Sequence, residues 1–293
     1  MNCYNSQTYL QEAIDSIITQ TYSDWELLFW DNQSTDNSAE IVQSYNDPRI
    51  KYYYAPEHTP LGKARNLVLK KITGNFVAFL DCDDIWLPKK LQLQLDLMQR
   101  SNLKMCYGGV IYIDENSEEK SRFLPDAHTG NVFRQLLKRY EVNMQSVMLR
   151  NDFDIHFDDT MQFSPDFDLF MKTAARYPVG VIHDYLVKYR ELSDSLTSKK
   201  IDRWGIEYEQ TLNDIFTAQP ELSSRYPTEY QLAYAKVAYY KARYSISRGN
   251  MHEARELLAP YRSASLTYAL LYALTFFPAT LWHFIHKLKQ AAR

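Results

Sequence analysis

The sequence predicts an α/β protein with a mostly parallel sheet and flanking helices, followed by an all-α C-terminal appendage. Two observations predict this fold class. As far as about residue 190, short apolar runs alternate with segments of helical period, which is typical of a parallel sheet. From residue 201 onward the pattern is helical throughout. The 293 residues, 45% of them hydrophobic, suffice for one large domain plus an appendage.

The composition argues against several classes of protein. A formal net charge of −3 lacks the basic surplus of a nucleic-acid binder, so no nucleic-acid partner is expected. The cysteines Cys3, Cys82 and Cys106 have no paired spacing and no histidine nearby. They therefore predict neither a disulfide framework nor a zinc site, and a reducing, cytoplasmic location is expected.

The first element in chain order is incomplete. Residues 2–6 resemble the loop after a first strand, and the helical period of residues 10–18 predicts the helix that follows it. The strand that should lead into this loop is apparently missing. We therefore expect Met1 to be an internal residue of a longer natural chain, with apolar β-branched residues directly upstream.

The next elements alternate between strand and helix. Further strands are predicted at residues 25–30, 50–54, 105–113 and 144–149, and helices at residues 38–45, 63–72 and 129–139. The strand at residues 25–30 runs into the polar loop at residues 31–36. It therefore places polar groups at the carboxyl edge of the sheet.

The stretch from Phe76 to Pro88 changes from apolar to acidic. Its five apolar residues predict a strand buried on both faces, and Asp81, Asp83 and Asp84 follow at its carboxyl end. Open α/β sheets bind ligands at this edge, and three carboxylates repel one another unless a cation lies between them. Mg²⁺ or Mn²⁺ with a phosphorylated ligand suits such a place. Alternatively, Asp84 caps a helix that begins near Pro88.

Five motifs occur in an order that resembles family 2 glycosyltransferases of the bacterial surface-polysaccharide type, over roughly residues 1 to 190. They are Cys3-Tyr4-Asn5, the run from Gln20 to Leu27, Asp31-x-x-Ser34-Thr35-Asp36, Gly62 to Asn66, and Phe79-Leu80-Asp81-x-Asp83-Asp84. The resemblance implies the GT-A fold, a nucleotide-sugar donor and inversion of the anomeric centre.

The resemblance also implies roles for residues that bind the donor. Tyr4 matches the aromatic residue that stacks on the base, and Asp31 or Asn32 falls where the family hydrogen-bonds the uracil or ribose. The family commonly has two acids followed by glycine there, whereas this chain has Asp31-Asn32-Gln33. Arg65 matches a residue near the diphosphate, to which a guanidinium can bind bidentately.

The acidic motifs match the family's metal site and general base. Asp83 is expected to bind the metal directly, with Asp81 as the second carboxylate and closer to the ribose. Asp166, at the start of a helix, matches the general base, although Pro165 stands where the family often has glutamate. Alternatively, Asp166 and Asp168 are only partners of the helix dipole.

The last stretch differs in kind. Residues 266–285 contain no formal charge, and basic residues flank them on both sides. They are long enough to span a bilayer, but Pro278 and several polar side chains favour short helices lying in the cytoplasmic leaflet. We therefore expect a catalytic domain at residues 1–195, a helical appendage at 196–262 and membrane-associated helices at 263–293, peripheral on the cytoplasmic face of the inner membrane.

These observations together predict an inverting, metal-dependent glycosyltransferase that acts in cell-surface polysaccharide synthesis. Its donor would be a UDP-sugar, and its acceptor a hydroxyl of a saccharide or a polyprenyl-linked molecule. Two alternatives remain open. One is a non-catalytic relative that binds a sugar or a partner, and the other is a metal-dependent nucleotidyltransferase, which should carry a basic, glycine-rich phosphate loop after the first strand.

Overall fold

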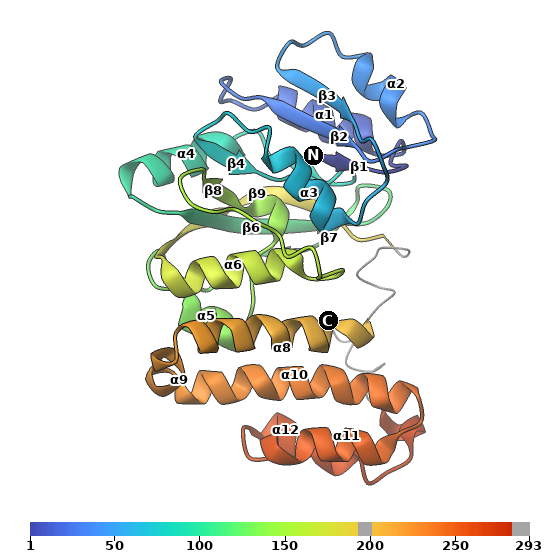
Figure 1. Cartoon of the computed structure of the whole chain (residues 1–293), viewed down its shortest axis with the longest axis vertical. Helices are drawn as coiled ribbons and strands as arrows, with labels where there is room; N and C mark the ends of the chain where they lie inside the picture. The colour runs from blue at the N-terminus through green and yellow to red at the C-terminus, as the bar shows by residue number, and fades with distance from the viewer. Residues whose placement is uncertain (193–200, 283–293) are drawn as a thin grey trace. The chain divides into compact units, whose positions relative to one another are not determined.

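A computed structural model describes residues 1–192 and 201–282 and divides the chain into two compact units (Figure 1). The first unit comprises residues 1–133 and 141–193, and it contains all the strands of the described chain. The second unit comprises residues 134–140 and 194–293, and helices make up the part of it that the structure describes. The predicted α/β fold with a helical C-terminal region is confirmed.

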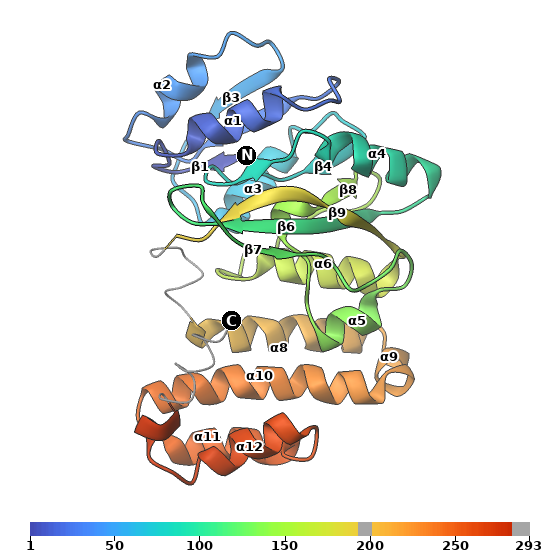
Figure 2. The same ribbon diagram turned by 180° about the vertical axis from the view of Figure 1, so that it is seen from behind.

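The first unit begins with a parallel sheet in the order β1-β2-β3. Its strands are β1 (Asn2–Cys3), β2 (Leu27–Asp31) and β3 (Ile50–Tyr54). Helix α1 (Leu10–Ile18) lies on one face and α3 (Leu61–Leu69) on the other, while α2 (Ser38–Gln43) connects β2 to β3 (Figures 1 and 2). All five residues of β2 are buried because helices cover both faces of this strand.

The expectation that the first strand is missing is wrong, because a two-residue strand is present. Asn2 and Cys3 pair in parallel with Trp30 and Asp31, and the Trp30 N–H donates to the Met1 carbonyl at 2.9 Å. Ser34 and Ser38 fix the loop that follows, because their hydroxyls accept the backbone N–H groups of residues 5 and 6. So short a strand has no hydrophobic period that the sequence could reveal.

The second sheet has the order β4-β8-β6-β9-β5, with β7 paired to β6. Its strands are β4 (Phe76–Ala78), β5 (Ile85–Trp86), β6 (Met105–Ile113), β7 (Glu119–Phe123), β8 (Met148–Arg150) and β9 (Val179–Arg190). Among the described strands of this sheet, only β6 and β9 pair in parallel. The prediction of a mostly parallel sheet therefore holds for the first sheet alone. The tight turn after β6 reverses the chain into a hairpin, and hairpin strands are antiparallel.

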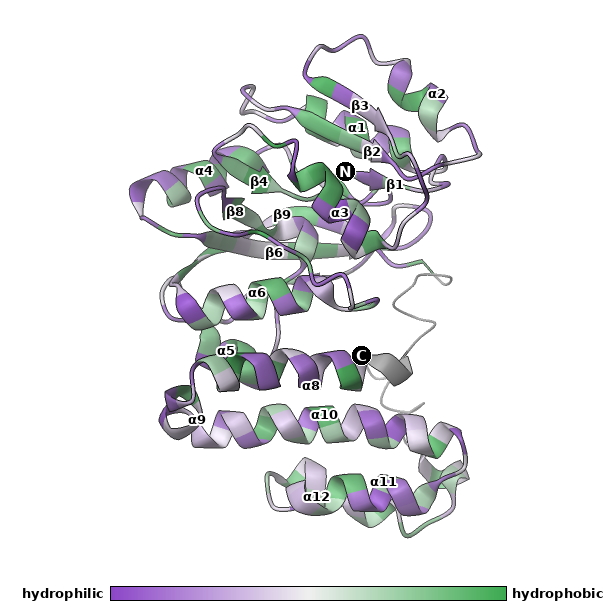
Figure 3. Cartoon of the chain, viewed as in Figure 1, coloured by the Kyte–Doolittle hydropathy of each residue, from purple (hydrophilic) through white to green (hydrophobic). Residues whose placement is uncertain are grey.

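Helices cover both sides of the second sheet. Helices α4 (Lys90–Arg100) and α6 (Pro165–Arg176) lie on opposite sides of it (Figures 1 and 2). Helix α6 alternates hydrophobic and hydrophilic segments along its length, as an amphipathic helix does (Figure 3). One hydrophobic core joins the two sheets, with Ile14, Phe29, Met98, Cys106 and Val187 among its buried members.

A cavity of about 480 Å³ lies between the two sheets. Leu27 and Leu28 of β2 line it, together with the whole of β4. The Met1 ammonium also borders the cavity and donates to the Leu28 carbonyl at 2.9 Å. Strand β4 is therefore only partly buried at Phe76 and Ala78, whereas the sequence predicts burial on both faces.

The second unit is a layered helical structure. Its helices are α5 (Phe133–Lys138), whose first residue belongs to the other unit, α8 (Ile201–Ala218), α9 (Glu221–Arg225), α10 (Pro227–Ser247), α11 (Met251–Leu258) and α12 (Leu266–Leu274). Helix α10 lies between α8 and α11 (Figure 1). Ala238, Ala242 and Ala254 let these helices approach closely, and Leu258 and Trp282 complete the core.

The apolar end of the chain is exposed where α12 forms. No residue of α12 is buried, and the side chains of Leu266 and Leu270 are 76% and 58% exposed. Within the residues that the structure describes, no helix is long and apolar enough to cross a membrane. The last three residues of the predicted apolar segment, 283–285, lie outside the described residues.

Candidate active site

The candidate site lies where β1, β2 and β4 end, within the first unit. The loops after β1 and β2 both turn through left-handed residues, Asn5 with φ 51° and Gln33 with φ 70°. Residues other than glycine seldom adopt this conformation, and it recurs at functional sites. The two loops hold each other, because the Asn5 Oδ1 accepts the Thr35 N–H at 2.7 Å.

Tyr4 presents an exposed aromatic ring in the first of these loops. The ring is 51% exposed, and its centroid lies 4.3 Å from that of His58, which comes from the loop between β3 and α3. The two ring planes are tilted by 54°, and the exposed Tyr4 ring offers an aromatic face on which a nucleotide base can stack. His58 has no role in the sequence analysis, because only the fold brings it to Tyr4.

Asp31 and Asn32 are buried beneath the two loops. The Asp31 carboxylate accepts the Ser34 N–H and the Tyr52 hydroxyl, each at 2.7 Å. The Asn32 Nδ2 donates to the Thr59 carbonyl at 2.7 Å, and its Oδ1 accepts the Thr59 N–H at 3.2 Å. Both side chains thus shape the loops. A direct contact between either of them and a donor stays a prediction.

Asp81 is held on both sides. Its Oδ1 accepts from the Arg65 Nη2 at 3.2 Å, and its Oδ2 accepts from the Gln145 Nε2 at 2.6 Å. Arg65 is 6% exposed, and its guanidinium lies 5.4 Å from the centroid of the Phe157 ring. The charge predicted to lie near a diphosphate is therefore anchored against an acid of the same site.

Asp83 carries a carboxylate that is left without a partner. Apart from its own backbone N–H, no hydrogen bond to it is found among the described residues. Burial and the charge of Asp81 raise the pKa of Asp83 to about 6. A desolvated anion beside a second carboxylate is where a cation would be stabilised.

Asp84 connects the acidic loop to another strand. It is 2% exposed, and its Oδ1 accepts the backbone N–H of Arg190 at 2.7 Å. It does not cap the next helix, because α4 begins after Lys89 and has no side-chain cap. Asp84 therefore ties the acidic loop to the end of β9.

These residues fit a hard divalent cation. Mg²⁺ and Mn²⁺ take one or two protein carboxylates and complete their shell with phosphate oxygens and water. Within residues 1–192 and 201–282 no cluster of three or more metal-ligating side chains occurs. Of these described residues, Asp83 and Asp81 would hold the cation through their carboxylates, and a bound phosphate would supply further oxygens.

Asp166 lies in the first turn of α6, where Pro165 begins the helix. Burial raises the pKa of Asp166, the charge of Arg65 lowers it, and the charge of Asp81 raises it again. Asp166 and Asp81 are thus electrostatic neighbours of the same guanidinium. Asp168 is also buried, and it forms an ion pair with Lys172 at 2.8 Å, which is a structural role.

One contact joins the acidic loop to the first strand. The Cys82 Sγ donates to the Asn2 carbonyl at 3.3 Å, so the loop of Tyr4 and the loop of Asp83 belong to one site. The site combines an exposed aromatic pair, a buried guanidinium, an unpaired carboxylate and an acid of raised pKa. Gln145 was missed, because the sequence places it in a strand, whereas it lies in a 3₁₀ turn at Met144–Ser146.

Comparison with known proteins gives a consistent result. The model of a family described as glycosyl transferase family 2 matches residues 1–164. The UDP-Glc:alpha-D-GlcNAc-diphosphoundecaprenol beta-1,3-glucosyltransferase WfgD of Escherichia coli is 32% identical over 202 residues, which are 68% of this chain and 79% of that protein. The putative teichuronic acid biosynthesis glycosyltransferase TuaG of Bacillus subtilis is 30% identical and covers 50% of this chain and 58% of that protein. The chain spans only 28% of an uncharacterized glycosyltransferase of Rickettsia bellii.

Solved structures share the fold. TarS of S. aureus (residues 1–349), in complex with UDP-GlcNAc, has a TM-score of 0.67 and 18% identity and covers 92% of this chain and 82% of that chain. The mannosyltransferase PcManGT of Pyrobaculum calidifontis, in complex with GDP-Man and Mn²⁺, has a TM-score of 0.58 and 16% identity and covers 96% of this chain and 81% of that chain.

Proposed function

Because the chain belongs to glycosyltransferase family 2, we propose that it transfers a sugar from a nucleotide-diphosphate donor to a hydroxyl group, with inversion of the anomeric centre. The observation that carries this proposal is the unpaired Asp83 carboxylate beside the contact between Arg65 and Asp81. A site of this kind is suited to the diphosphate of a donor and its divalent cation.

The chain's own residues would each have one task. Tyr4, with His58 packed beside it, would stack on the base, and Arg65 would bring positive charge to the diphosphate. Asp83 and Asp81 would hold Mn²⁺ or Mg²⁺. The cation, when bound, stabilises the negative charge that grows on the departing nucleoside diphosphate.

Asp166 would act as the general base. The acceptor oxygen forms a bond to the anomeric carbon while its proton passes to the Asp166 carboxylate. The bond from the anomeric carbon to the phosphate oxygen breaks, and its electron pair leaves with the diphosphate. Burial raises the pKa of Asp166, which makes its carboxylate a better proton acceptor than an exposed one.

The donor and the acceptor are proposed from relatives. WfgD is named for a UDP-Glc donor and a diphosphoundecaprenol-linked acceptor, and TarS binds UDP-GlcNAc. By analogy, a UDP-sugar is the proposed donor and a saccharide or lipid-linked molecule the proposed acceptor, within cell-surface polysaccharide synthesis.

A lipid-linked acceptor would require access to a membrane surface. The exposed face of α12 suits this task, because Leu266 and Leu270 are open to solvent and Arg262 precedes the helix. Apolar side chains with flanking basic residues are typical of helices that lie in the membrane interface. The proposed division is thus a catalytic region to residue 195, a helical appendage at 196–262 and a membrane-contacting end at 263–293, on the cytoplasmic face.

A ligand screen followed by a transfer assay tests the proposed function. We expect one UDP-sugar to raise the Tm in the presence of Mn²⁺, because a ligand that binds the folded state stabilises it by mass action. The same donor should then label a diphospholipid-linked sugar acceptor. Absence of any shift with UDP-, GDP- and dTDP-sugars in Mn²⁺ or Mg²⁺, together with no transfer, would show the proposal to be wrong. Binding without transfer to any acceptor would favour the non-catalytic alternative.

A further inference from the structure

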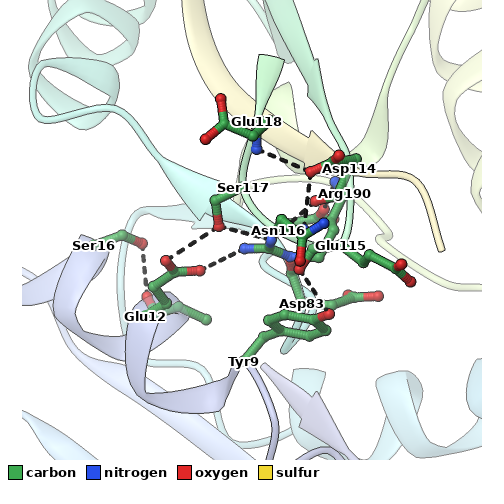
Figure 4. Close-up of polar contacts among 12 residues, drawn as sticks. Tyr9, Glu12, Ser16, Asp83, Asp114, Glu115, Asn116, Ser117, Glu118 and Arg190 are labelled. Carbon is green, nitrogen blue, oxygen red and sulfur yellow. Dashed lines mark hydrogen bonds and ion pairs between the residues drawn. The ribbon is translucent and has the colours of Figure 1, made fainter. Parts of the chain in front are cut away.

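Arg190, the last residue of β9, is buried beside the acidic loop. Its side chain is 0% exposed, and its nitrogens donate to acceptors in three separate segments of the chain (Figure 4). Arg190 Nε donates to the Asp83 carbonyl at 2.9 Å. Nη1 donates to the Asp114 carbonyl at 3.1 Å and to the Ser117 hydroxyl at 2.8 Å, both in the turn between β6 and β7.

The third segment is helix α1. Nη2 of Arg190 forms an ion pair with Glu12, and the guanidinium lies 4.1 Å from the centroid of the Tyr9 ring. Tyr9 in turn donates its hydroxyl to the Glu115 carbonyl at 3.0 Å, as Figure 4 shows. Arg190 is thus the common partner of α1, the turn after β6 and the acidic loop.

Arg190 holds two consecutive residues of the acidic loop by different groups. Its side chain binds the carbonyl of Asp83, and its backbone N–H binds the carboxylate of Asp84. These two contacts hold the carbonyl of Asp83 and the side chain of Asp84, on the two sides of one peptide bond. Because the backbone limits which rotamers a side chain can adopt, the contacts also restrict the direction of the Asp83 carboxylate.

We propose that Arg190 is a positioning residue for the divalent cation: it fixes the backbone of Asp83 so that the otherwise unpaired carboxylate is presented to the metal. This inference rests on the proposed function, in which Asp83 binds the cation. Arg190 does not touch the metal itself. It acts as the outer partner of a ligating carboxylate, and such partners are worth about 10- to 100-fold in metal affinity.

The chemistry of the contacts requires arginine. Three of its nitrogens donate in a fixed plane to the acidic loop, the turn after β6 and Glu12. Lysine has a single nitrogen on a flexible stem and cannot reach these partners together. Glu12 balances the charge, so the guanidinium is stable in its buried position.

The same contacts connect the acidic loop to the loop of Tyr4. Glu12 lies in helix α1, and Tyr9 is the N-cap of that helix, which begins at Leu10, directly after the loop that presents Tyr4. A displacement of Arg190 would therefore disturb the metal site and the base site through one residue. The proposal predicts that Mn²⁺ binding and nucleotide binding strengthen each other less when Arg190 is replaced.

The experiment measures Mn²⁺ affinity directly, by titration calorimetry or Mn²⁺ electron paramagnetic resonance, in the presence and absence of UDP. Arg190→Gln and Arg190→Lys should each raise the Kd for Mn²⁺ about tenfold or more. Arg122→Gln is the matched control, because Arg122 forms an exposed ion pair with Glu119 on β7, away from the acidic loop. It should leave the Kd unchanged.

If Arg190→Gln does not fold, a variant with a smaller structural change still tests the proposal. Glu12→Gln keeps the Arg190 side chain and one acceptor but removes its counter-ion, and we expect a smaller rise in the Kd for Mn²⁺, about two- to fivefold. A lower Tm with an unchanged Kd for Mn²⁺ in the folded variants would assign Arg190 a purely structural role and overturn the proposal.

Two different results distinguish a wrong metal site from a wrong role for Arg190. If the wild-type protein binds no Mn²⁺ with or without UDP, the metal site itself is wrong and the positioning role falls with it. If the wild type binds Mn²⁺ and folded Arg190 variants bind it equally well, only the role of Arg190 is wrong.

Discussion

Gln145 and Asp81 are joined by two hydrogen bonds. The Gln145 Nε2 donates to the Asp81 Oδ2 at 2.6 Å, and the Asp81 backbone N–H donates to the Gln145 Oε1 at 2.9 Å. With Arg65 on the other oxygen, Asp81 is fixed in place. Asp83, two residues later, has no such support for its carboxylate. The two acids of the Asp-x-Asp pair are therefore distinct, one oriented by the protein and one left open to a cation.

Replacement of Asp83 by asparagine should stabilise the metal-free protein. Burial raises the pKa of Asp83 from an ordinary 3.8 to about 6. The folded state therefore binds the Asp83 proton more tightly than the unfolded state does. The contribution of this proton to the free energy of unfolding is complete below about pH 4 and is lost as the pH rises through about 6. At pH 8 the variant lacks the costly charge, and its free energy of unfolding should rise by about 1 to 3 kcal/mol, measured by urea unfolding in EDTA.

The same variant should lose metal-dependent ligand binding. Mn²⁺ with UDP should raise the Tm of the wild type but not that of Asp83→Asn or Asp83→Ala. Cys82→Ser is the matched control, because serine can still donate to the Asn2 carbonyl. A full Mn²⁺-dependent shift in Asp83→Ala would remove Asp83 from the metal site.

The titration of Lys90 should make the free energy of unfolding depend on pH, independently of the active site. Lys90 is fully buried, and burial lowers its pKa to about 7. In the unfolded chain its pKa is near 10.5, so the unfolded state binds more protons between about pH 7 and pH 10. The cost of the buried amine is complete below about pH 7 and is relieved as the pH rises.

Lys90→Met removes this titration. Between pH 7 and pH 9, the free energy of unfolding of the wild type should rise, relative to that of the variant, by up to about 1.4 kcal/mol per pH unit. Urea unfolding at three pH values measures the difference. Parallel curves for the two proteins would show that Lys90 is not neutralised by burial.

Much of the fold could be predicted from the sequence, because many of its helices and strands have a clear hydrophobic period. The strand at residues 50–54 and the strand at residues 105–113 have the predicted bounds. The periodicity cannot show how strands pair, so the antiparallel pairings of the second sheet were not predicted. The strand β1 was not predicted because two residues are too few to show a hydrophobic period.

The candidate site was predicted only in part. The sequence indicates which carboxylates follow a strand, so Asp81 and Asp83 could be found. It does not show which of them the protein itself satisfies, since Gln145 and Arg65 reach Asp81 from distant segments. Asp31 and Asn32 have the residue types of ligand contacts, yet their hydrogen bonds go to neighbouring loops.

Two leucines of α12 should control binding to lipid vesicles. Leu266→Glu combined with Leu270→Glu should weaken binding to anionic vesicles at least about tenfold, because each leucine buried in lipid contributes about 1.5 kcal/mol or more. Ile206→Glu is the matched control, since Ile206 is equally exposed at 58% but lies on α8. Flotation with vesicles measures the bound fraction. Equal binding by all three proteins would exclude α12 as the membrane contact.

The most direct test of the account is the turnover of Asp166→Asn with a donor that binds. Asparagine keeps the size of the side chain but cannot accept the acceptor's proton, so donor binding should persist while kcat falls about 10²- to 10⁴-fold. Asp168→Asn, which removes a buried ion pair with Lys172 in the same helix, should lower the Tm and leave kcat within a few-fold of the wild type. An Asp166→Asn variant that transfers sugar at the wild-type rate would contradict the assignment of the general base.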